Sequence, residues 1–346
     1  MAGFPKDAVL REAEVGRRVG YVLVFVGFFL LFSGLSVRFY AYPRLQKAPL
    51  NQYSAPVAVG SATYFNRKQL REVNAQIQNI RTVKGDAKAG NSSTAVWDSF
   101  TATKDLGDDG VLDASRERVA LDRVTGESKH CCGDQPPHSG LTFKFPFNTQ
   151  KRAYSFWDTM AKQAFPATYA GSERIRGLEV YRFEQRFNNV RLETFQVSGA
   201  QAGQPGVATV PATIMYSNVK TLWVEPRTGI IVKAGQDVTR LLQTDAGVTV
   251  LTAFKGSLVY DDDTVRGNVD DARAAMSQLR MIQWILPIGA LALGVVLIVA
   301  GVMMIARRPT GTPVAGQTEE LSPQPEPQPQ REPQPQPEPE PRADAH

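Results

Sequence analysis

The stretch His130-Cys131-Cys132-Gly133-Asp134, with His138 shortly after it, holds the residue types best suited to site chemistry in this 346-residue sequence. Its two imidazoles and two thiols could bind a metal, but structural zinc sites usually separate their cysteines by about two to four residues. Outside the cytoplasm the pair could oxidise to a vicinal disulfide, although neighbouring Cα atoms lie only about 3.8 Å apart. We favour a strained disulfide between Cys131 and Cys132 that locks the loop over free or intermolecular thiols, and we expect no metal site.

Signatures of catalysis are missing from the sequence. It contains no G-x-S-x-G elbow, no G-x-x-x-x-G-K-[ST] phosphate loop, no G-x-G-x-x-G fingerprint and no H-E-x-x-H motif. Its net charge is +5, but the charges alternate in sign and form no basic run with interleaved aromatic residues. We therefore expect a protein that is not an enzyme, with no catalytic residues, no cofactor and no nucleic-acid partner.

Apolar residues are concentrated in two runs, at 19–37 and 281–306, each long enough to cross a bilayer as a helix. The first follows Arg17-Arg18 and lacks a small-x-small cleavage site after it, which is typical of an uncleaved signal anchor. The second ends at Arg307-Arg308. Because paired arginines flank both runs on the terminal side, we expect a two-pass protein of the plasma membrane with both termini cytoplasmic.

These runs divide the chain into five segments. They are a cytoplasmic N-terminal segment at 1–18, a first transmembrane helix at 19–37, an extracytoplasmic β-rich domain at 38–280, a second transmembrane helix at 281–306 and a cytoplasmic tail at 307–346. Proline occupies nearly every second position from 322 to 341, and the tail has almost no apolar residues to bury. The tail is therefore predicted to be disordered.

Polar and apolar residues alternate through much of the central domain, which predicts antiparallel strands. The expected strands cover 141–147, 178–184, 190–197, a hairpin at 221–233 with its turn at 226–229, 248–254 and 257–260. Helical spacing occurs at 155–165 and, more clearly, at 263–280, which begins with aspartates and continues into the second apolar run. The expected fold class is α+β, mainly antiparallel β, flanked by two transmembrane α-helices.

Glycines recur at seven-residue intervals in both apolar runs, at Gly20, Gly27 and Gly34 and again at Gly294 and Gly301. Small residues on one face let membrane helices approach closely. We expect these glycines to pack the two helices against each other, antiparallel.

Several strings resemble one family of actinobacterial envelope proteins, known as the porin PorA family or as a domain of unknown function. They include 121–126, 130–133, 140–147, 177–181 and 215–229, and the resemblance runs from Arg18 to Gly301. It implies two membrane helices around an outer domain like a lipid-binding fold, and an association with envelope lipid and lipoglycan assembly. It supplies no catalytic residues.

The leading hypothesis is a non-enzymatic, membrane-anchored envelope factor that binds or presents lipids. An aromatic inner face of the sheet would contact acyl chains, and the candidate residues are Phe143, Phe145, Phe147, Tyr181, Phe183 and Trp223, with Lys144 on the wet face. The expected partners are membrane lipids and an envelope lipid transporter or assembly proteins. The alternatives are a scaffold for envelope-assembly proteins and a porin-like component.

Overall fold

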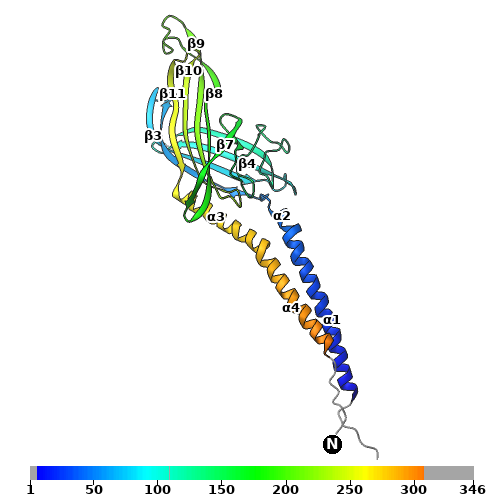
Figure 1. Ribbon diagram of the computed structural model, residues 1–346. Coiled ribbons are helices and arrows are strands. Elements are labelled where there is room, and N and C mark those ends of the chain that lie inside the picture. Colours follow the sequence, from blue (N-terminus) through cyan, green and yellow to red (C-terminus); the bar gives the residue numbers. More distant parts are fainter. Residues whose placement is uncertain (1–5, 109, 308–346) are drawn as a thin grey trace, which may run out of the picture.

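The computed structural model describes residues 6–108 and 110–307. The chain starts with a long apolar helix, crosses into a large β domain and returns through a second long helix (Figure 1). The helical elements are α1 (Lys6–Ser36), η1 (Val37–Ala41), α2 (Tyr42–Leu45), α3 (Asp262–Arg280), η2 (Met281–Ile285) and α4 (Leu286–Ala306), where η marks a π-helical turn. The predicted proline-rich tail lies outside the described residues, apart from Arg307.

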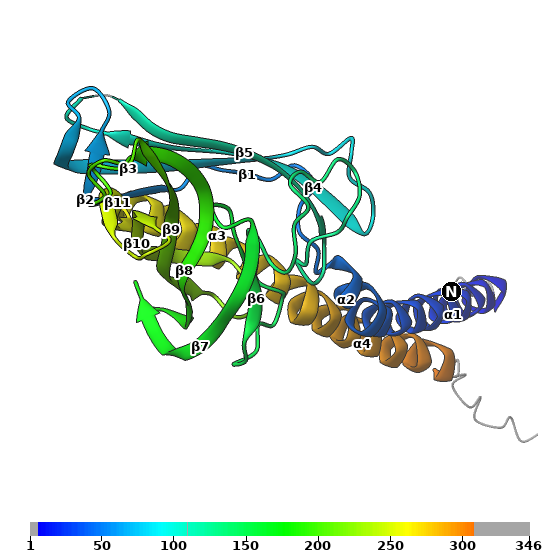
Figure 2. The same cartoon turned by 90° about the horizontal axis from the view of Figure 1, so that it is seen from above.

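One antiparallel sheet forms the domain, in the order β5-β4-β3-β2-β11-β10-β9-β8-β7-β6, with β1 paired to β3. Its strands are β1 (Tyr53–Ser54), β2 (Val57–Asn66), β3 (Arg71–Gly85), β4 (Thr94–Asp105), β5 (Val111–Asp122), β6 (Tyr154–Asp158), β7 (Gln163–Ile175), β8 (Leu178–Ser198), β9 (Thr209–Val224), β10 (Ile231–Thr244) and β11 (Thr249–Tyr260). Seen from above, the sheet curves into a half-barrel, so that β5 and β6 lie on opposite sides of α3 (Figure 2). The predicted fold class is confirmed.

The segment 123–153 connects the two edge strands of the half-barrel along its open side. It forms isolated bridges to β5 at Arg118 and Leu121 and, through Leu141, to Phe156 of β6. We call this closure the seam. Because the seam covers edges that would otherwise expose unpaired backbone groups, it protects the domain from edge-to-edge pairing.

Helix α3 packs across the end of the sheet from which the two apolar helices extend (Figure 1). The side chain of Asp261 accepts the Thr264 N–H and caps the helix, and an apolar stripe that includes Val265, Val269 and Ala272 is buried against β8 and β10. The helix then continues through η2 into α4, as the sequence predicts.

Two of the predicted elements are wrong. Residues 155–165 form β6, a turn and the start of β7, because the Asp158 carboxylate accepts the N–H groups of Met160 and Ala161 and closes a turn. Residues 141–147 form an irregular part of the seam, because the backbone turns at Gly140 and Asn148, where φ is positive, and Pro146 has no N–H for a sheet ladder.

The other predicted strands are present, in longer elements. Residues 178–184 and 190–197 belong to the single strand β8, and the predicted strands 248–254 and 257–260 are parts of the single strand β11, which begins at Thr249. The hairpin at 221–233 is confirmed, since β9 and β10 pair on either side of the turn at 226–229.

Helices α1 and α4 are long and apolar enough to cross a membrane, and they lie side by side. Gly27 faces Gly294 so closely that a Cβ added at Gly27 would lie 2.7 Å from the Gly294 carbonyl oxygen. Gly20 faces Gly301 in the same way, and Gly34 lies over the Pro287 carbonyl. Since β-carbons at Gly20 and Gly27 would collide with backbone oxygens of α4, these two glycines permit this close approach.

Candidate functional site

A cavity of about 780 Å³ lies inside the half-barrel. Residues from β1–β6, β9–β11, the seam and α3 line it. Its volume is within the range of about 300–1,000 Å³ typical of small-molecule sites and far exceeds the space of roughly 30 Å³ that one water occupies. The cavity is therefore a built feature of the fold and not a packing defect.

Most of the surface inside the cavity is apolar. The sheet supplies aliphatic and aromatic side chains and the seam supplies two phenylalanines; examples are Val83, Val238, Phe254, Leu258, Phe143 and Phe147. A concave, mainly apolar wall with a few polar groups is the usual construction of a site for an apolar ligand.

The cavity extends to the end of the domain that adjoins the two apolar helices. Leu45 of α2, at the end of the first apolar helix, and Ile282 of η2, at the start of the second, both line it. At this level the Arg38 guanidinium lies 4.7 Å from the ring centre of Trp284, an arrangement typical of a membrane–water interface. The cavity thus starts where the chain leaves the predicted membrane.

Ion pairs hold most of the charged side chains of the cavity wall. The Lys220 ammonium lies 2.8 Å from Asp158, the Arg240 guanidinium 3.4 Å from Asp113, and the Arg81 guanidinium 3.4 Å from Glu117. Lys47, also in the wall, donates to the carbonyl oxygen of Ser92. These pairings leave little free charge in the wall.

Lys144 differs from these side chains. Its residue is 8% exposed, and within the described residues its ammonium has no hydrogen-bond partner and no ion pair. The Nζ atom lies 3.9 Å from the ring centre of Phe147. Burial lowers the pKa of Lys144 to about 7, and the charge of Asp122 opposes this only partly because Asp122 pairs with Lys129. Its predicted place on the wet face is wrong, since 141–147 does not form a strand.

The six candidate aromatic residues fall into three groups. Phe143 and Phe147 line the cavity. Phe145 and Phe183 are fully buried and stack 4.7 Å apart in a cluster under the sheet, with Tyr181 packed at its edge. Trp223 packs beside α3 and donates to Glu173. Four of the six therefore lie outside the cavity wall. Alternation along the sequence does not place all six on one face, because the backbone of the seam is irregular and both faces of the sheet are covered in places.

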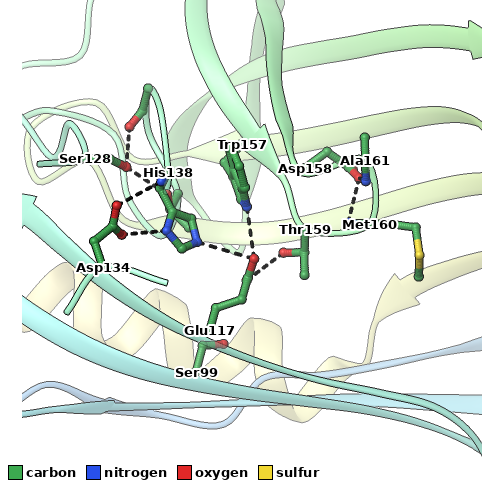
Figure 3. Close-up of polar contacts among 12 residues, drawn as sticks. Ser99, Glu117, Ser128, Asp134, His138, Trp157, Asp158, Thr159, Met160 and Ala161 are labelled. Carbon is green, nitrogen blue, oxygen red and sulfur yellow. Dashed lines mark hydrogen bonds and ion pairs between the residues drawn. The ribbon is translucent and has the colours of Figure 1, made fainter. Parts of the chain in front are cut away.

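A buried polar cluster fastens the seam to both edge strands (Figure 3). Glu117 of β5 accepts hydrogen bonds from Trp157 of β6 at 3.0 Å and from Thr159 at 2.8 Å, and it lies 3.4 Å from His138 Nε2. The other ring nitrogen of His138 lies 2.6 Å from Asp134. Since His138 is fully buried between two carboxylates, the cluster is suited to holding the closure and not to reaching a substrate.

The charges of this cluster depend on one another. Burial raises the pKa of Glu117, but hydrogen bonds from His138, Trp157 and Thr159 and the charge of Arg81 outweigh it and bring the pKa to about 2. Burial lowers the pKa of His138, but its two carboxylate partners outweigh this and raise the pKa above the ordinary value. The structure therefore favours a protonated His138 beside an ionised Glu117.

The two cysteines are free, exposed thiols in the structure, so the predicted vicinal disulfide is not formed there. The two histidines of this stretch lie on either side of Asp134: a ring nitrogen of the buried His138 is 2.6 Å from its carboxylate, and Nδ1 of His130, whose side chain is 70% exposed, is 3.5 Å from it.

The family described as Porin PorA matches residues 19–303. The chain belongs to the porin PorA family. Two curated relatives carry the name Porin PorA. The one from Corynebacterium resistens is 23% identical over 232 residues, which cover 49% of this chain and 56% of the relative. The one from Corynebacterium amycolatum is 25% identical over 207 residues, which cover 47% of this chain and 53% of the relative. The chain thus spans about half the length of the curated relatives it matches.

Sequence reasoning on this porin PorA family member missed the two features that define the site. Lys144 was placed by alternation on the wrong side, and the pairing of Glu117 with His138 joins residues 21 positions apart that no local pattern connects. One signal was available: a lysine inside an aromatic run, between Phe143 and Phe145, is a residue whose burial requires an explanation.

Proposed function

We propose that this member of the porin PorA family is a non-enzymatic envelope factor that binds a membrane lipid in the cavity of the half-barrel. The observation that carries the proposal is the cavity of about 780 Å³, mainly apolar, which extends to the end of the domain next to the apolar helices. A site for a soluble ligand has no need of such a position. An acyl chain can enter from the bilayer without crossing bulk water.

The energy available from burial is sufficient to hold a lipid. Moving one 16-carbon chain from water into an apolar wall contributes about 0.8 kcal/mol per methylene, or roughly 12 kcal/mol before ordering costs. A lipid leaving a bilayer is already in an apolar environment, so the net gain on transfer is much smaller. The cavity is therefore suited to exchange with the membrane, which is what a factor that presents lipids to an envelope transporter or assembly protein requires.

The proposed topology follows from the flanking charges. Paired arginines at 17–18 and 307–308 favour cytoplasmic termini, which places the β domain outside the plasma membrane. A domain tethered at both ends cannot diffuse as a free shuttle, so it would act on lipids of the membrane that anchors it.

A pore-forming role is the second candidate, favoured by the name of the family and of its relatives. The described residues provide two apolar helices per chain, so a pore would need several copies. Conductance of planar bilayers containing the purified full chain tests this role directly. The scaffold hypothesis lacks a comparable observation, because it does not account for the cavity that lies among the packed clusters of the domain.

Filling the cavity tests lipid binding. Thr101 lines the cavity on β4, whereas its neighbour Phe100 is 47% exposed and is not part of the wall. A Thr101→Trp substitution places a large side chain in the cavity, and Phe100→Trp places the same residue one position away on the same strand.

We expect the detergent-extracted full chain to retain lipid that mass spectrometry identifies, Thr101→Trp to retain at least fivefold less, and Phe100→Trp to match the wild type. Equal lipid content in all three proteins, or none in any, would contradict the proposal. Thermal unfolding of each variant shows whether it is folded.

A further inference from the structure

The wall of the cavity has an excess of basic side chains. Five of them, Lys47, Arg81, Lys144, Lys220 and Arg240, face three acidic ones, Asp113, Asp158 and Asp271. Arg81, Lys220 and Arg240 each have a carboxylate partner, and Lys47 is held by a backbone carbonyl. The excess positive charge that lacks a partner is therefore concentrated at Lys144.

A buried lysine without a partner is costly to the ligand-free domain. The free energy of removing an ammonium from water is regained only when a counter-charge or hydrogen-bond acceptors replace the water. The ring of Phe147 supplies part of this, and Asp122 supplies little because Lys129 is 2.9 Å from it. The Nζ atom is buried with three hydrogens and no acceptor among the described residues.

We propose that Lys144 binds the acidic headgroup, a phosphate or a carboxylate, of the amphiphile held in the cavity. This inference rests on the proposed lipid-binding function and adds the class of ligand. An anionic oxygen next to Nζ supplies the missing acceptor and counter-charge, and Lys is a common phosphate ligand that acts as a point charge. The same wall offers apolar side chains, among them Phe143 and Phe147, to the chain of the amphiphile.

Arg240 is the next strongest candidate for this role, since its Nε atom is also buried without a partner. Its guanidinium, however, retains the Asp113 carboxylate at 3.4 Å and lies 4.9 Å from the ring centre of Phe254. Lys144 has no carboxylate within ion-pair distance in the described part of the chain, so a bound anion changes its environment most.

The test compares lipids that differ only in the headgroup. Full-length protein in detergent, stripped of bound lipid, is incubated with radiolabelled phosphatidic acid or with diacylglycerol of the same acyl chains, and the amount retained is measured. A second pair, palmitate and hexadecanol, repeats the comparison for a carboxylate. The readout is the ratio of acidic to neutral lipid retained, for the wild type, Lys144→Met, Lys144→Arg and the exposed control Lys88→Met.

We expect a wild-type ratio well above one that falls about tenfold in Lys144→Met, because a hydrogen bond to a charged group is lost, and that is largely kept in Lys144→Arg and Lys88→Met. Near-ultraviolet circular dichroism establishes that each variant is folded. If Lys144→Met unfolds, Lys144→Gln removes the charge in its place, and the same fall in the ratio is expected.

Other outcomes separate the two proposals. A wild-type ratio near one, or a high ratio unchanged in Lys144→Met, overturns the role of Lys144 and leaves lipid binding intact. Retention of neither lipid contradicts the proposed function itself. Calorimetric binding of inorganic phosphate that depends on Lys144, without preference for phosphatidic acid, overturns the lipid headgroup in favour of a soluble anion.

Discussion

Replacing Lys144 by methionine is expected to stabilise the ligand-free protein, although it removes a charged side chain. The folded-state pKa of Lys144 is about 7, whereas the unfolded chain has the ordinary value of 10.5. Between these two pH values the unfolded state therefore binds more protons than the folded state, so the free energy of unfolding increases as the pH rises from about 7 to 10.5. The destabilisation caused by the buried ammonium reaches its full size below about pH 7.

The size of this cost follows from the two pKa values. The difference of 3.5 between 10.5 and about 7 corresponds to about 5 kcal/mol at low pH. Contact with the Phe147 ring offsets up to about 2 kcal/mol, which leaves about 3 kcal/mol. For a domain of this size, each kcal/mol shifts Tm by about 2–4 °C, so Lys144→Met should raise Tm at pH 6 by about 6–12 °C.

Tryptophan fluorescence during heating measures Tm, since Trp97 and Trp157 are buried in the domain. Wild type and Lys144→Met are compared from pH 6 to pH 10, with the exposed Lys88→Met as the control. The gap between wild type and Lys144→Met should narrow as the pH rises, and the control should show no gap. A lower Tm for Lys144→Met at pH 6, or a gap that does not change with pH, would refute the reasoning.

Three further predictions concern the seam and the membrane helices. The stabilisation from ionised Glu117 is present above about pH 4.5 and is lost as the pH falls towards 2, whereas the stabilisation from protonated His138 is complete below about pH 6.5 and is lost as the pH rises through its raised pKa. The Tm difference between wild type and Glu117→Gln should therefore be largest between about pH 4.5 and 6.5. A Tm difference that is flat from pH 3 to 9 would argue against the pairing of Glu117 with His138. Cysteines introduced at Gly34 and Ala290, whose Cβ atoms would lie 3.4 Å apart, should form a disulfide between α1 and α4. Gly27→Leu should reduce the yield of this cross-link severalfold, whereas Phe28→Leu, at an exposed position, should not. Equal cross-linking yields in the two variants would contradict the packing role of Gly27. A cysteine at Ser92 should react with an impermeant thiol reagent in intact cells of a Cys131→Ser, Cys132→Ser background, and one at Ser322 should not; the reverse pattern would invert the proposed topology.

Local patterns predicted the parts of the fold whose causes are local. The hairpin at 221–233 follows from strand alternation around a Pro-Arg-Thr-Gly turn, and α3 follows from its spacing and its aspartates at the N-terminus. The glycine spacing likewise predicts that the two helices pack through their glycines, and Gly27 lies opposite Gly294 in the structure. In each case a short stretch of sequence contains the interaction that decides the structure.

The cavity and its lysine depend on contacts that a local pattern does not contain. Residues 141–147 alternate like a strand, but they close the barrel as an irregular segment whose Phe145 N–H bonds to Gly229. Lys144 is therefore buried, with its Nζ atom over the Phe147 ring. The 155–165 stretch has helical spacing, but the side chain of Asp158 stabilises a turn there. The cavity itself exists only after the sheet, the seam and α3 have come together.

Cross-linking of a photoreactive lipid to the full chain in its membrane tests the central claim most directly. A phospholipid with a diazirine near the end of an acyl chain is incorporated, irradiated and mapped by peptide mass spectrometry. Lipid binding in the half-barrel predicts labelled peptides from the cavity wall, such as those containing Val238 and Leu258, in addition to α1 and α4, and loss of the wall labels in Thr101→Trp. Labels confined to α1 and α4 would contradict the account.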